Sequence, residues 1–279
     1  MREIRSIYIF EGTDARMRRL SSVLSEKFKI KRSFPPRNAD AVIFPLPTTR
    51  DGETVSGTFP AMRLTDAVSR IHSCSDGALF ITGMAPEGFR AECEGLSHPC
   101  RDIYDSETFA EENAAITAEG ALFSYMKEGR GTVRGKRVLI TGFGRVARNT
   151  AGLFASLSAE VTVAARSESA LSEAAANGYG TAKLFDCGEK LSAISKADLI
   201  INTVPARIIS GYELAAIGDG AVIIELASFP YGIDPADAEN YGHTVIRLPS
   251  LPASYAPREA ADIIKNEILR FFGELGGTT

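Results

Sequence analysis

The sequence predicts an α/β protein built from two doubly wound parallel-sheet domains. Three observations lead to this prediction. Short apolar segments alternate with longer helical segments, a pattern typical of a parallel sheet flanked by helices. The same alternation starts again in the second half of the chain, after a glycine-rich break. The length of 279 residues also exceeds what one core needs, which favours two domains over one large domain.

The first domain is expected over residues 1–128. Its strand-like segments are apolar throughout, as expected where helices cover both faces of a sheet. The turns at the carboxyl ends of such strands face the ligand crevice in open α/β sheets, so this domain is expected to bind substrate or a partner. The expected strands and helices are Ser6–Phe10, Ala15–Phe28, Ala41–Pro45, Pro60–Ile71, Ala78–Thr82 and Pro86–Glu94, and Ser106–Lys127 reads as one or two connecting helices.

The second domain, a Rossmann dinucleotide-binding domain, is expected over residues 129–255, with its boundary in Gly129–Gly135. A final amphipathic helix, Glu259–Leu275, falls in the remaining segment 256–279 and is expected to pack back on the first domain. The expected elements of the second domain are strand Arg137–Thr141, helix Val146–Leu157, strand Glu160–Ala164, helix Glu168–Asn177, and strands Leu199–Thr203, Ala221–Leu226 and Thr244–Arg247.

Composition excludes several classes of protein. A net charge of −4 provides no general basic surface, which argues against nucleic acid and anionic membranes as partners. The N-terminus lacks a signal-peptide pattern and the apolar runs are too short for a membrane helix, so we expect a cytoplasmic protein. The four cysteines have neither CxxC spacing nor paired histidines, which favours reduced thiols over a metal site or a disulfide framework.

A glycine-rich turn, GFGRVA at residues 142–147, follows an expected strand and opens an expected helix. This context is typical of a Rossmann dinucleotide site. Gly142 permits the tight turn, Gly144 lets the backbone approach a pyrophosphate, and Ala147 leaves room between helix and strand. The N–H groups at the helix start, at Arg145 and Val146, would hold the phosphates. The alternative is a glycine-rich turn without a nucleotide.

The end of the next strand bears on the choice of cofactor. NAD-binding sites usually place Asp or Glu there to bind the ribose 2′-hydroxyl. This chain has Arg166 and Ser167 instead, and a guanidinium with a neutral hydroxyl favours the 2′-phosphate of NADP. Glu168 keeps NAD open as the alternative. Thr203 and Pro205, after a later strand, are expected beside the nicotinamide ribose.

Seven segments together carry a resemblance to a known family. They are GTDAR at 12–16, ITAEGAL at 116–122, GKRVLITGFGRVAR at 135–148, VTVAARS at 161–167, INTVP at 201–205, ELAS at 225–228 and LPSLPASYAP at 248–257. In this order they resemble the dehydrogenase-like subunit of dipicolinate synthase over nearly the whole chain. The glycine turn is shared by many dehydrogenases, whereas the second and the last two segments are more specific. Ile116 and Ala253 depart from the Pro and Gly that the family often has there.

The resemblance implies a reaction and a partner. The reaction is the NADP-linked oxidation of dihydrodipicolinate, formed from a lysine-pathway intermediate, to the aromatic dicarboxylate dipicolinate during bacterial sporulation. The partner is the other, flavoprotein-like subunit of dipicolinate synthase, and a homo-oligomer stays open. A dianionic substrate requires cationic groups and strong donors at its site, and aromatisation of the ring favours loss of hydride.

Candidate substrate and catalytic residues come from strand-end turns and from the resembling segments. Glu119 is the candidate proton acceptor, with a helix-capping role as its alternative. Arg16 is expected to direct its donors to a substrate carboxylate while Asp14 caps the helix, with a solvated Arg16 as the alternative. The histidines (His72, His98 and His243) are away from strand-end turns and are expected to be structural. Further candidates for substrate contact, in a space enclosed between the two domains, are Thr48, Thr49, Gly83, Ser254 and Tyr255.

Two other functions stay open. The first is a dehydrogenase or reductase for a hydroxy or amino acid, which shares two α/β domains but is expected to supply an Arg, Glu and His set. The second is a non-catalytic nucleotide-sensing or scaffolding protein that keeps the fold for binding alone. NADPH production from the lysine-pathway intermediate would distinguish all three.

Overall fold

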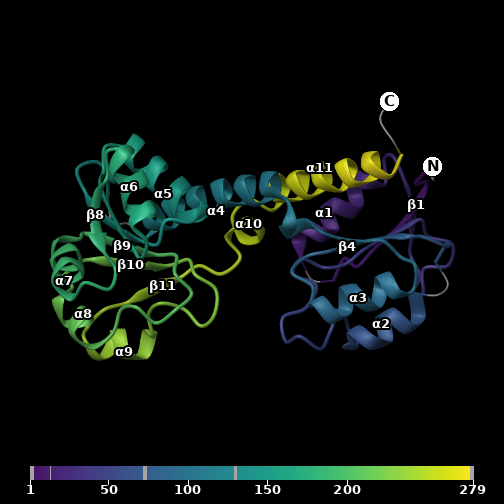
Figure 1. Cartoon of the computed structure of the whole chain (residues 1–279), viewed down its shortest axis with the longest axis horizontal. Helices are drawn as coiled ribbons and strands as arrows, with labels where there is room; N and C mark the ends of the chain where they lie inside the picture. The colour runs from purple at the N-terminus through teal and green to yellow at the C-terminus, as the bar shows by residue number, and fades with distance from the viewer. Residues whose placement is uncertain (1–2, 13, 72–73, 129–130, 277–279) are drawn as a thin grey trace. The chain divides into compact units, whose positions relative to one another are not determined.

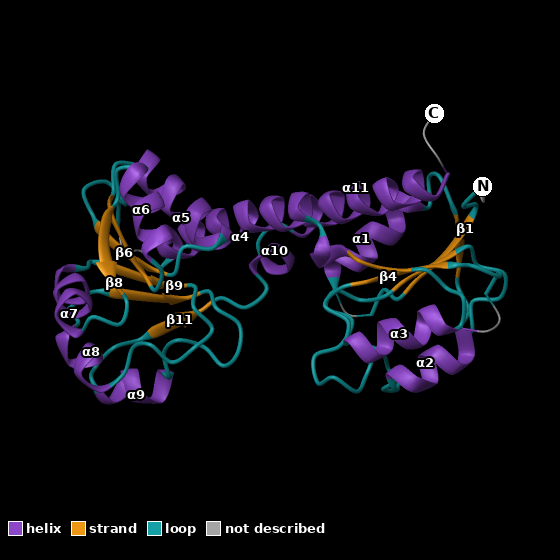
Figure 2. Ribbon diagram, in the orientation of Figure 1, coloured by secondary structure: helices purple, strands orange, loops and turns teal. Residues whose placement is uncertain are grey.

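Two parallel β-sheets, each covered by helices on both faces, form two α/β units in the computed structural model (Figures 1 and 2). The structure describes residues 3–12, 14–71, 74–128 and 131–276. Unit 1 comprises Met1–Asn113 and Ala253–Thr279, and unit 2 comprises Ala114–Pro252. The predicted fold class, two doubly wound parallel-sheet units, is therefore confirmed.

The sheet of unit 1 has five parallel strands in the order β2-β1-β3-β4-β5. Its strand order reverses between β1 and β3, which makes this the switch point where open α/β sheets bind ligands. The central strands β3 and β4 are entirely buried, whereas the edge strand β2 is partly exposed. The strands are β1 (Ser6–Ile9), β2 (Lys29–Lys31), β3 (Ala41–Ile43), β4 (Leu79–Thr82) and β5 (Cys100–Asp102).

Helices cover the two faces of this sheet as two separate apolar clusters. On one face, α1 and the C-terminal helix α11 pack together, and Ile264 and Ile268 lie in the same buried cluster as Met17. On the other face, α2 and α3 bury Val68 and Phe89. The helices are α1 (Ala15–Leu24), α2 (Leu64–Ile71), α3 (Glu87–Gly95), the short 3₁₀ helix η1 (Ile103–Asp105) and α11 (Pro257–Gly276).

The sheet of unit 2 has six parallel strands in the order β11-β10-β9-β6-β7-β8. In chain order this is the 3-2-1-4-5-6 arrangement of dinucleotide-binding sheets, with its switch point between β6 and β9. The strands are β6 (Arg137–Thr141), β7 (Glu160–Ala165), β8 (Gly180–Lys183), β9 (Leu199–Asn202), β10 (Val222–Glu225) and β11 (Val245–Arg247).

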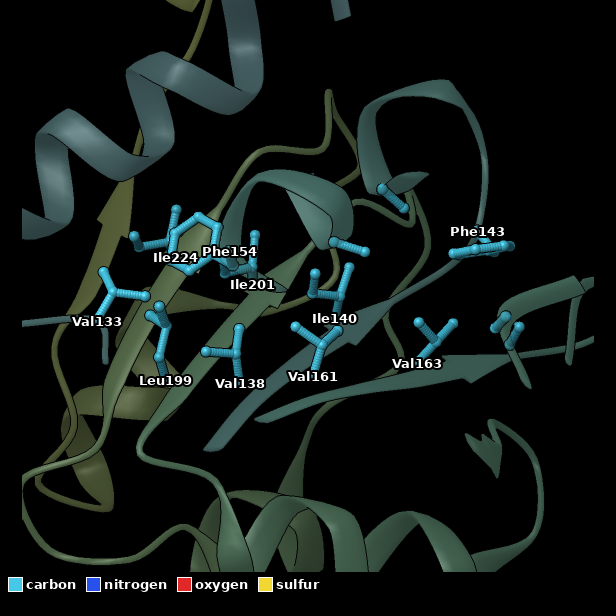
Figure 3. Packing of buried hydrophobic residues seen from close by; sticks show 14 of the residues in the cluster. Val133, Val138, Ile140, Phe143, Phe154, Val161, Val163, Leu199, Ile201 and Ile224 are labelled. Atoms are coloured by element: carbon cyan, nitrogen blue, oxygen red, sulfur yellow. The ribbon is translucent and has the colours of Figure 1, made fainter. Parts of the chain in front are cut away.

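Two apolar clusters also hold unit 2 together. Figure 3 shows the first, in which Phe154 of α5 packs with Val138, Ile140 and Ile201 of the sheet. The second cluster includes Ile194 of α7 and Leu214 of α8. The helices are α5 (Arg145–Ser156), α6 (Glu168–Ala176), α7 (Cys187–Lys196), α8 (Gly211–Ala216) and α9 (Pro235–Asn240), and the short helix α10 (Leu251–Ser254) contains the boundary between Pro252 of unit 2 and Ala253 of unit 1.

Helix α4 (Glu107–Lys127) is one continuous helix that belongs to both units. Phe109, near its start, lies in a core cluster of unit 1, and Tyr125, near its end, lies in a core cluster of unit 2. The units therefore divide between Asn113 and Ala114, before the glycine segment Gly129–Gly135 that the sequence suggested, of which residues 129–130 lie outside the described ranges. Across the described ranges, no helix has the length and apolar character that crossing a bilayer requires.

Candidate functional site

The glycine turn lies at the carboxyl end of β6, beside the switch point of the unit 2 sheet. Gly142 adopts φ +84°, in the left-handed region that favours glycine. A Cβ at this position would lie 2.8 Å from Thr203 Oγ1 and 3.0 Å from Val204 Cγ2. The backbone of the turn is therefore closely packed against the loop that follows β9, and only glycine fits there.

Helix α5 begins at this turn with Gly144 as its N-cap residue. Gly144 provides no side-chain hydrogen bond to the first turn of the helix, and a Cβ there would meet no atom within 4 Å. Ala147 is fully buried one turn further on. The start of α5, with Arg145 and Val146 in its first turn, thus has open space in front of N–H groups that favour an anion. These features fit the pyrophosphate of a dinucleotide.

A pocket of about 380 Å³ lies beside the turn, at the carboxyl ends of β7 and β8. Its walls are mostly apolar, and its polar members are Arg166 and Ser167. Arg166 is exposed and, among the described residues, makes no hydrogen bond or ion pair. The lining residues are Gly142, Phe143, Ala165, Arg166, Ser167, Ala170, Leu184, Phe185, Val204, Ala206 and Ile208. The size and lining fit an adenosine group, with Arg166 available to a 2′-phosphate.

The neighbours of Arg166 weaken the alternative in which Glu168 binds a ribose hydroxyl. Glu168 Oε1 lies 2.8 Å from Lys183 Nζ, in an ion pair between α6 and β8. Ser167 is the N-cap of α6, and its Oγ accepts a hydrogen bond of 3.3 Å from the N–H of Ala170. The acidic group beside the pocket is thus already paired, whereas the guanidinium is not.

The loop after β9 carries the residues expected beside the nicotinamide ribose. Thr203 Oγ1 donates a 2.7 Å hydrogen bond to the carbonyl of Thr141, so this hydroxyl joins the ends of β9 and β6. Pro205 is exposed further along the loop. Thr203 therefore supports the glycine turn directly, whereas Pro205 is accessible to solvent.

A buried polar row across the sheet is the feature that sequence reasoning missed. Thr141, Asn202 and Glu225 end β6, β9 and β10 and are paired in register. Thr141 Oγ1 and Asn202 Nδ2 each donate a hydrogen bond of 2.5 Å, to Asn202 Oδ1 and Glu225 Oε1 respectively. Asn202 is 0% exposed and Glu225 1%. Burial raises the pKa of the Glu225 carboxyl, and the hydrogen bonds that it accepts partly offset this.

Glu225 also fixes the loop that follows β10. Its Oε1 accepts a hydrogen bond from the N–H of Ala227, and its Oε2 accepts hydrogen bonds from the N–H groups of Gly232 and Ile233, all at 3.0–3.1 Å. A Cβ on Gly232 would overlap the side-chain amide of Asn202, so the loop passes directly over the row. The signal in the sequence was an acidic residue at the end of an apolar strand, in the segment ELAS.

In unit 1, Asp14 and Arg16 bind each other. Asp14 is the N-cap of α1, as predicted, and accepts a 2.8 Å hydrogen bond from the N–H of Arg16. Arg16 is only 5% exposed, and its Nη2 donates to Asp14 Oδ2 at 2.7 Å and to the carbonyl of Leu46 at 2.6 Å. Although burial acts to raise it, the pKa of Asp14 is lowered by the hydrogen bonds and charge of Arg16.

These contacts bear on both readings of Arg16. It is not a solvated helix residue, because its side chain is buried. Its Nε and Nη2 already donate to the carboxylate of Asp14 and to a backbone carbonyl, and its role in binding a substrate carboxylate stays a prediction. A buried guanidinium needs such partners, and the turn after β1 supplies one of them.

Thr48 and Gly83 meet at the carboxyl ends of neighbouring strands, as their positions in the sequence suggested. The N–H of Thr48 donates to the carbonyl of Gly83 at 2.7 Å, and Thr48 Oγ1 accepts from the N–H of Gly83 at 2.9 Å. A Cβ on Gly83 would overlap the side chain of Leu46. Thr49 is partly exposed and binds Asp51 through its hydroxyl. Both the N–H and the hydroxyl of Thr48 are thus used to join two loops, and Thr49 has the more accessible side chain.

The other candidates lie on α4, on α10 and in the segment between α10 and α11. Glu119 is exposed in the middle of α4, so it does not cap that helix. Ser254 is exposed at the end of α10, and Tyr255 is partly buried between α10 and α11. His98 stacks on Phe80 with ring centroids 4.5 Å apart, and His243 contacts the carbonyl of Leu214 at 3.0 Å. His72 lies outside the described residues.

Comparison with known proteins places these features in context. Residues 101–228 match the model of the D-isomer specific 2-hydroxyacid dehydrogenase, NAD binding domain family. A dipicolinate synthase subunit of Bacillus subtilis (strain 168) is 25% identical over 241 residues, which is 86% of this chain and 80% of that protein. Both the matched domain and the geometry of the glycine turn indicate a nicotinamide dinucleotide cofactor and a dehydrogenase-like role.

Solved structures share the fold over nearly the whole chain. The crystal structure of a dipicolinate synthase subunit from Bacillus halodurans has a TM-score of 0.83 and 23% identity, over 98% of this chain and 99% of that chain. The corresponding chain of dipicolinate synthase from Bacillus subtilis has a TM-score of 0.82 and 23% identity, over 99% and 98%. The resemblance noted in the sequence is therefore confirmed.

Proposed function

We propose, from the similarity to the dehydrogenase-like subunit of dipicolinate synthase, that this chain is an NADP-dependent oxidoreductase that converts dihydrodipicolinate to dipicolinate. The observation that carries the proposal is the extent of the similarity, which reaches 86% of the chain rather than the dinucleotide-binding unit alone. The resembling segments also include TAEGA, ELAS and LPSLPASYAP, which are not part of the glycine turn.

The geometry of the pocket supports NADP as the cofactor. The guanidinium of Arg166 is exposed, has no ion-pair partner in the described part of the chain and lies next to the hydroxyl of Ser167, and its charge matches a 2′-phosphate. An acid at this place would repel that phosphate, and the neighbouring Glu168 forms an exposed ion pair with Lys183. We assign the pyrophosphate to the turn at residues 142–147 and the nicotinamide ribose to the loop with Thr203 and Pro205.

The reaction removes a hydride and a proton from the dihydropyridine ring, and the bound nicotinamide accepts the hydride. The chain must therefore hold the ring in place, bind two carboxylates and receive a proton. Glu119, whose carboxylate is exposed on α4, is our candidate proton acceptor. Thr49, Ser254 and Tyr255 remain candidate donors to the substrate.

The proposed assembly and setting also come from the similarity. We propose that the chain works with the flavoprotein-like subunit of dipicolinate synthase in the synthesis of dipicolinate during sporulation. Co-expression followed by size-exclusion chromatography tests this, and separate elution together with full activity of the isolated chain would contradict the partner.

NADPH formation is the experiment that tests the function. The purified chain, with and without the flavoprotein-like subunit, is supplied with NADP⁺ and with dihydrodipicolinate generated from the lysine-pathway intermediate. We expect NADPH and dipicolinate to form in equal amounts, and Gly144→Val to abolish both. Binding of NADPH without turnover in either preparation would favour the nucleotide-sensing alternative.

A second candidate function is favoured by the match of residues 101–228 to a 2-hydroxyacid dehydrogenase domain. In that case the chain would reduce a 2-oxo acid with NADPH or NADH. A panel of 2-oxo acids and their amino-acid counterparts, assayed with both cofactors, distinguishes the two functions. Turnover of any of these, with none of dihydrodipicolinate, would replace our proposal.

A further inference from the structure

The polar row across the unit 2 sheet ends in a cation. Glu225, the last residue of β10, pairs in register with Arg247, the last residue of β11. Side chains of paired residues in neighbouring parallel strands project from the same face of the sheet. The row therefore runs from the buried Thr141, Asn202 and Glu225 to Arg247, which is exposed. The buried part is fully hydrogen-bonded, so the chemistry that it leaves accessible is the guanidinium at its edge.

Arg247 differs from Arg207, another arginine of unit 2, because no described acidic residue forms an ion pair with it. Among the described residues it makes no ion pair, and it contacts the ring of Tyr231, whose centroid lies 4.3 Å from Cζ. In contrast, Arg207 pairs with Asp234 and Asp237. A guanidinium over an aromatic face keeps its N–H donors at the edge, where they can bind a carboxylate in a bidentate manner.

The support beneath this guanidinium is built into the loop after β10. Tyr231 has φ +64°, in the left-handed region that is unfavourable for a residue with a side chain. Glu225 accepts hydrogen bonds from the N–H groups of Ala227 and Gly232, which lie before and after Tyr231 in the chain. These bonds hold the strained backbone at Tyr231 in place. Phe229 packs edge-on against Tyr231 at 5.9 Å and is largely exposed. The loop thus supplies the ring of Tyr231 under Arg247 of β11, with the exposed ring of Phe229 beside it.

The order of the strands indicates what lies near this pair. The adenosine pocket is at the ends of β7 and β8, on one side of the switch point between β6 and β9. A dinucleotide lies across that point, so its nicotinamide half extends toward β9, β10 and β11. Arg247 and Tyr231 belong to the β10 and β11 end, and hence to the nicotinamide side of the sheet.

We infer that Arg247, held by the ring of Tyr231, binds one carboxylate of a planar dicarboxylate substrate beside the nicotinamide. Arg247 is then a substrate-binding residue and Tyr231 a positioning residue. This inference rests on the proposed function, because it takes the substrate to be a flat ring with two carboxylates. It adds a site for one carboxylate on unit 2, whereas the candidate that the sequence offered for such a contact, Arg16, lies in unit 1.

Binding of the stable product, dipicolinate, to the NADPH complex tests the inference without turnover. Isothermal titration compares dipicolinate with picolinate, which has one carboxylate. We expect wild-type protein to bind dipicolinate more tightly than picolinate. Arg247→Ala should weaken the binding of dipicolinate by about 10 to 100-fold, so that the two ligands bind with similar affinity. The dipicolinate affinity of Arg247→Lys should lie between those of wild type and Arg247→Ala, because lysine keeps the charge but cannot bind a carboxylate through two parallel hydrogen bonds. The matched control is Arg207→Ala, since Asp234 and Asp237 already neutralise that residue.

Tyr231 is tested by conservative replacement. Tyr231→Phe keeps the ring under Arg247 and should retain the affinity for dipicolinate. Tyr231→Leu should lose part of that affinity, and in steady-state assays it should raise KM more than it lowers kcat. NADPH affinity is measured for every variant and should not change, which also shows that each variant is folded. If Arg247→Ala proves unfolded, the comparison of Arg247→Lys with wild type decides.

The outcomes separate this inference from the proposed function. Unchanged dipicolinate affinity in both Arg247 variants, with wild type still preferring dipicolinate over picolinate, overturns the inference alone. Absence of dipicolinate binding in wild-type protein that does bind NADPH overturns both. Absence of NADPH formation from dihydrodipicolinate, with the Arg247-dependent preference intact, counts against the proposed reaction but supports the carboxylate site.

Discussion

The hydroxyl of Thr203 lies 2.8 Å from the point where a Cβ would stand on Gly142. Thr203 cannot yield easily, because the same hydroxyl donates a 2.7 Å hydrogen bond to the carbonyl of Thr141. Two loops from strands on either side of the switch point are thereby packed at their backbones. Gly144, two residues further on, has no atom within 4 Å of its own Cβ position. Two glycines of one motif thus have different surroundings: Gly142 is packed against the loop after β9, whereas Gly144 faces open space.

The two glycines are expected to respond differently to substitution. Gly142→Ala should lower the free energy of unfolding by about 1–3 kcal/mol, because it places a side chain at positive φ and against Thr203. Gly144→Val should leave stability nearly unchanged and abolish NADPH binding, because its side chain occupies the space assigned to the pyrophosphate. Urea unfolding and fluorescence titration measure the two effects. Normal NADPH binding by a folded Gly144→Val variant would refute the assignment of the turn.

Cofactor preference is expected to depend on Arg166. Arg166→Ala should weaken NADPH binding by about 1–3 kcal/mol, the scale of a lost charge-assisted hydrogen bond, and leave NADH nearly unaffected. Arg134→Ala is the matched control, since Arg134 is another exposed arginine of unit 2 that lies outside the pocket. Dissociation constants for both cofactors give the result. Equal or tighter binding of NADH by wild-type protein would show that the pocket does not select the 2′-phosphate.

Arg16 is expected to act through stability. Arg16→Ala removes the partner of a mostly buried Asp14 and a donor to the carbonyl of Leu46, so the free energy of unfolding should fall by about 2–4 kcal/mol. Arg19→Ala, an exposed arginine of the same helix, should change it little. A stable Arg16→Ala variant with a roughly 10 to 100-fold lower kcat/KM would instead return Arg16 to the substrate site.

The ion pair of Asp198 with Arg137 predicts a dependence of stability on pH. The hydrogen bonds and charge of Arg137 lower the pKa of Asp198 from its ordinary value of 3.8 to about 2. A lowered pKa stabilises the fold above pH 3.8, and this contribution is lost as the pH falls toward 2. Asp198→Asn should therefore cost up to about 1 kcal/mol at neutral pH, since the pair is largely exposed. The difference from wild type should shrink as the pH falls below 3.8 and disappear as it falls through about 2 in denaturant unfolding curves.

Thiol labelling is expected to separate the cysteines. Cys187 is exposed, whereas Cys74, Cys93 and Cys100 are buried. Burial raises the pKa of the Cys93 thiol to about 12 and that of Cys100 to about 11, so few thiolates form there in mildly alkaline buffer. One equivalent of a thiol reagent should react quickly, and Cys187→Ser should remove that fast phase. Fast reaction of more than one thiol in native protein would contradict the buried placement.

Much of the fold followed from local patterns. The strands with continuous apolar residues, such as β4 and β9, were found because burial on both faces leaves a strong signal. The edge strands β2, β5 and β8 were missed, because they are short and partly polar. Helix α4 was expected, but the boundary between the two units was not expected inside it. A boundary within a helix leaves no break in the composition of the sequence.

The site was predictable where its chemistry resides in a local motif. The glycine turn and Arg166 needed only the sequence of strand, turn and helix. The row from Thr141 to Arg247 joins side chains from four strands that are far apart in the chain: Thr141 and Asn202 are 61 positions apart, and Asn202 and Glu225 are 23 apart, so no local spacing reveals it. The burial of Arg16 was hidden for a related reason, because its acceptor on Leu46 lies thirty residues away in sequence.

The divided path of unit 1 along the chain has a consequence for synthesis on the ribosome. Unit 2 is one uninterrupted stretch, Ala114–Pro252, so its core can close once that stretch has emerged. Unit 1 cannot, because Ile264 and Ile268 of α11 belong to a core that also contains Ile7. The N-terminal part of unit 1 must therefore wait, with part of its apolar face uncovered, until α11 is made. A nascent chain of this protein should need protection by chaperones at its N-terminal part for longer than in its middle.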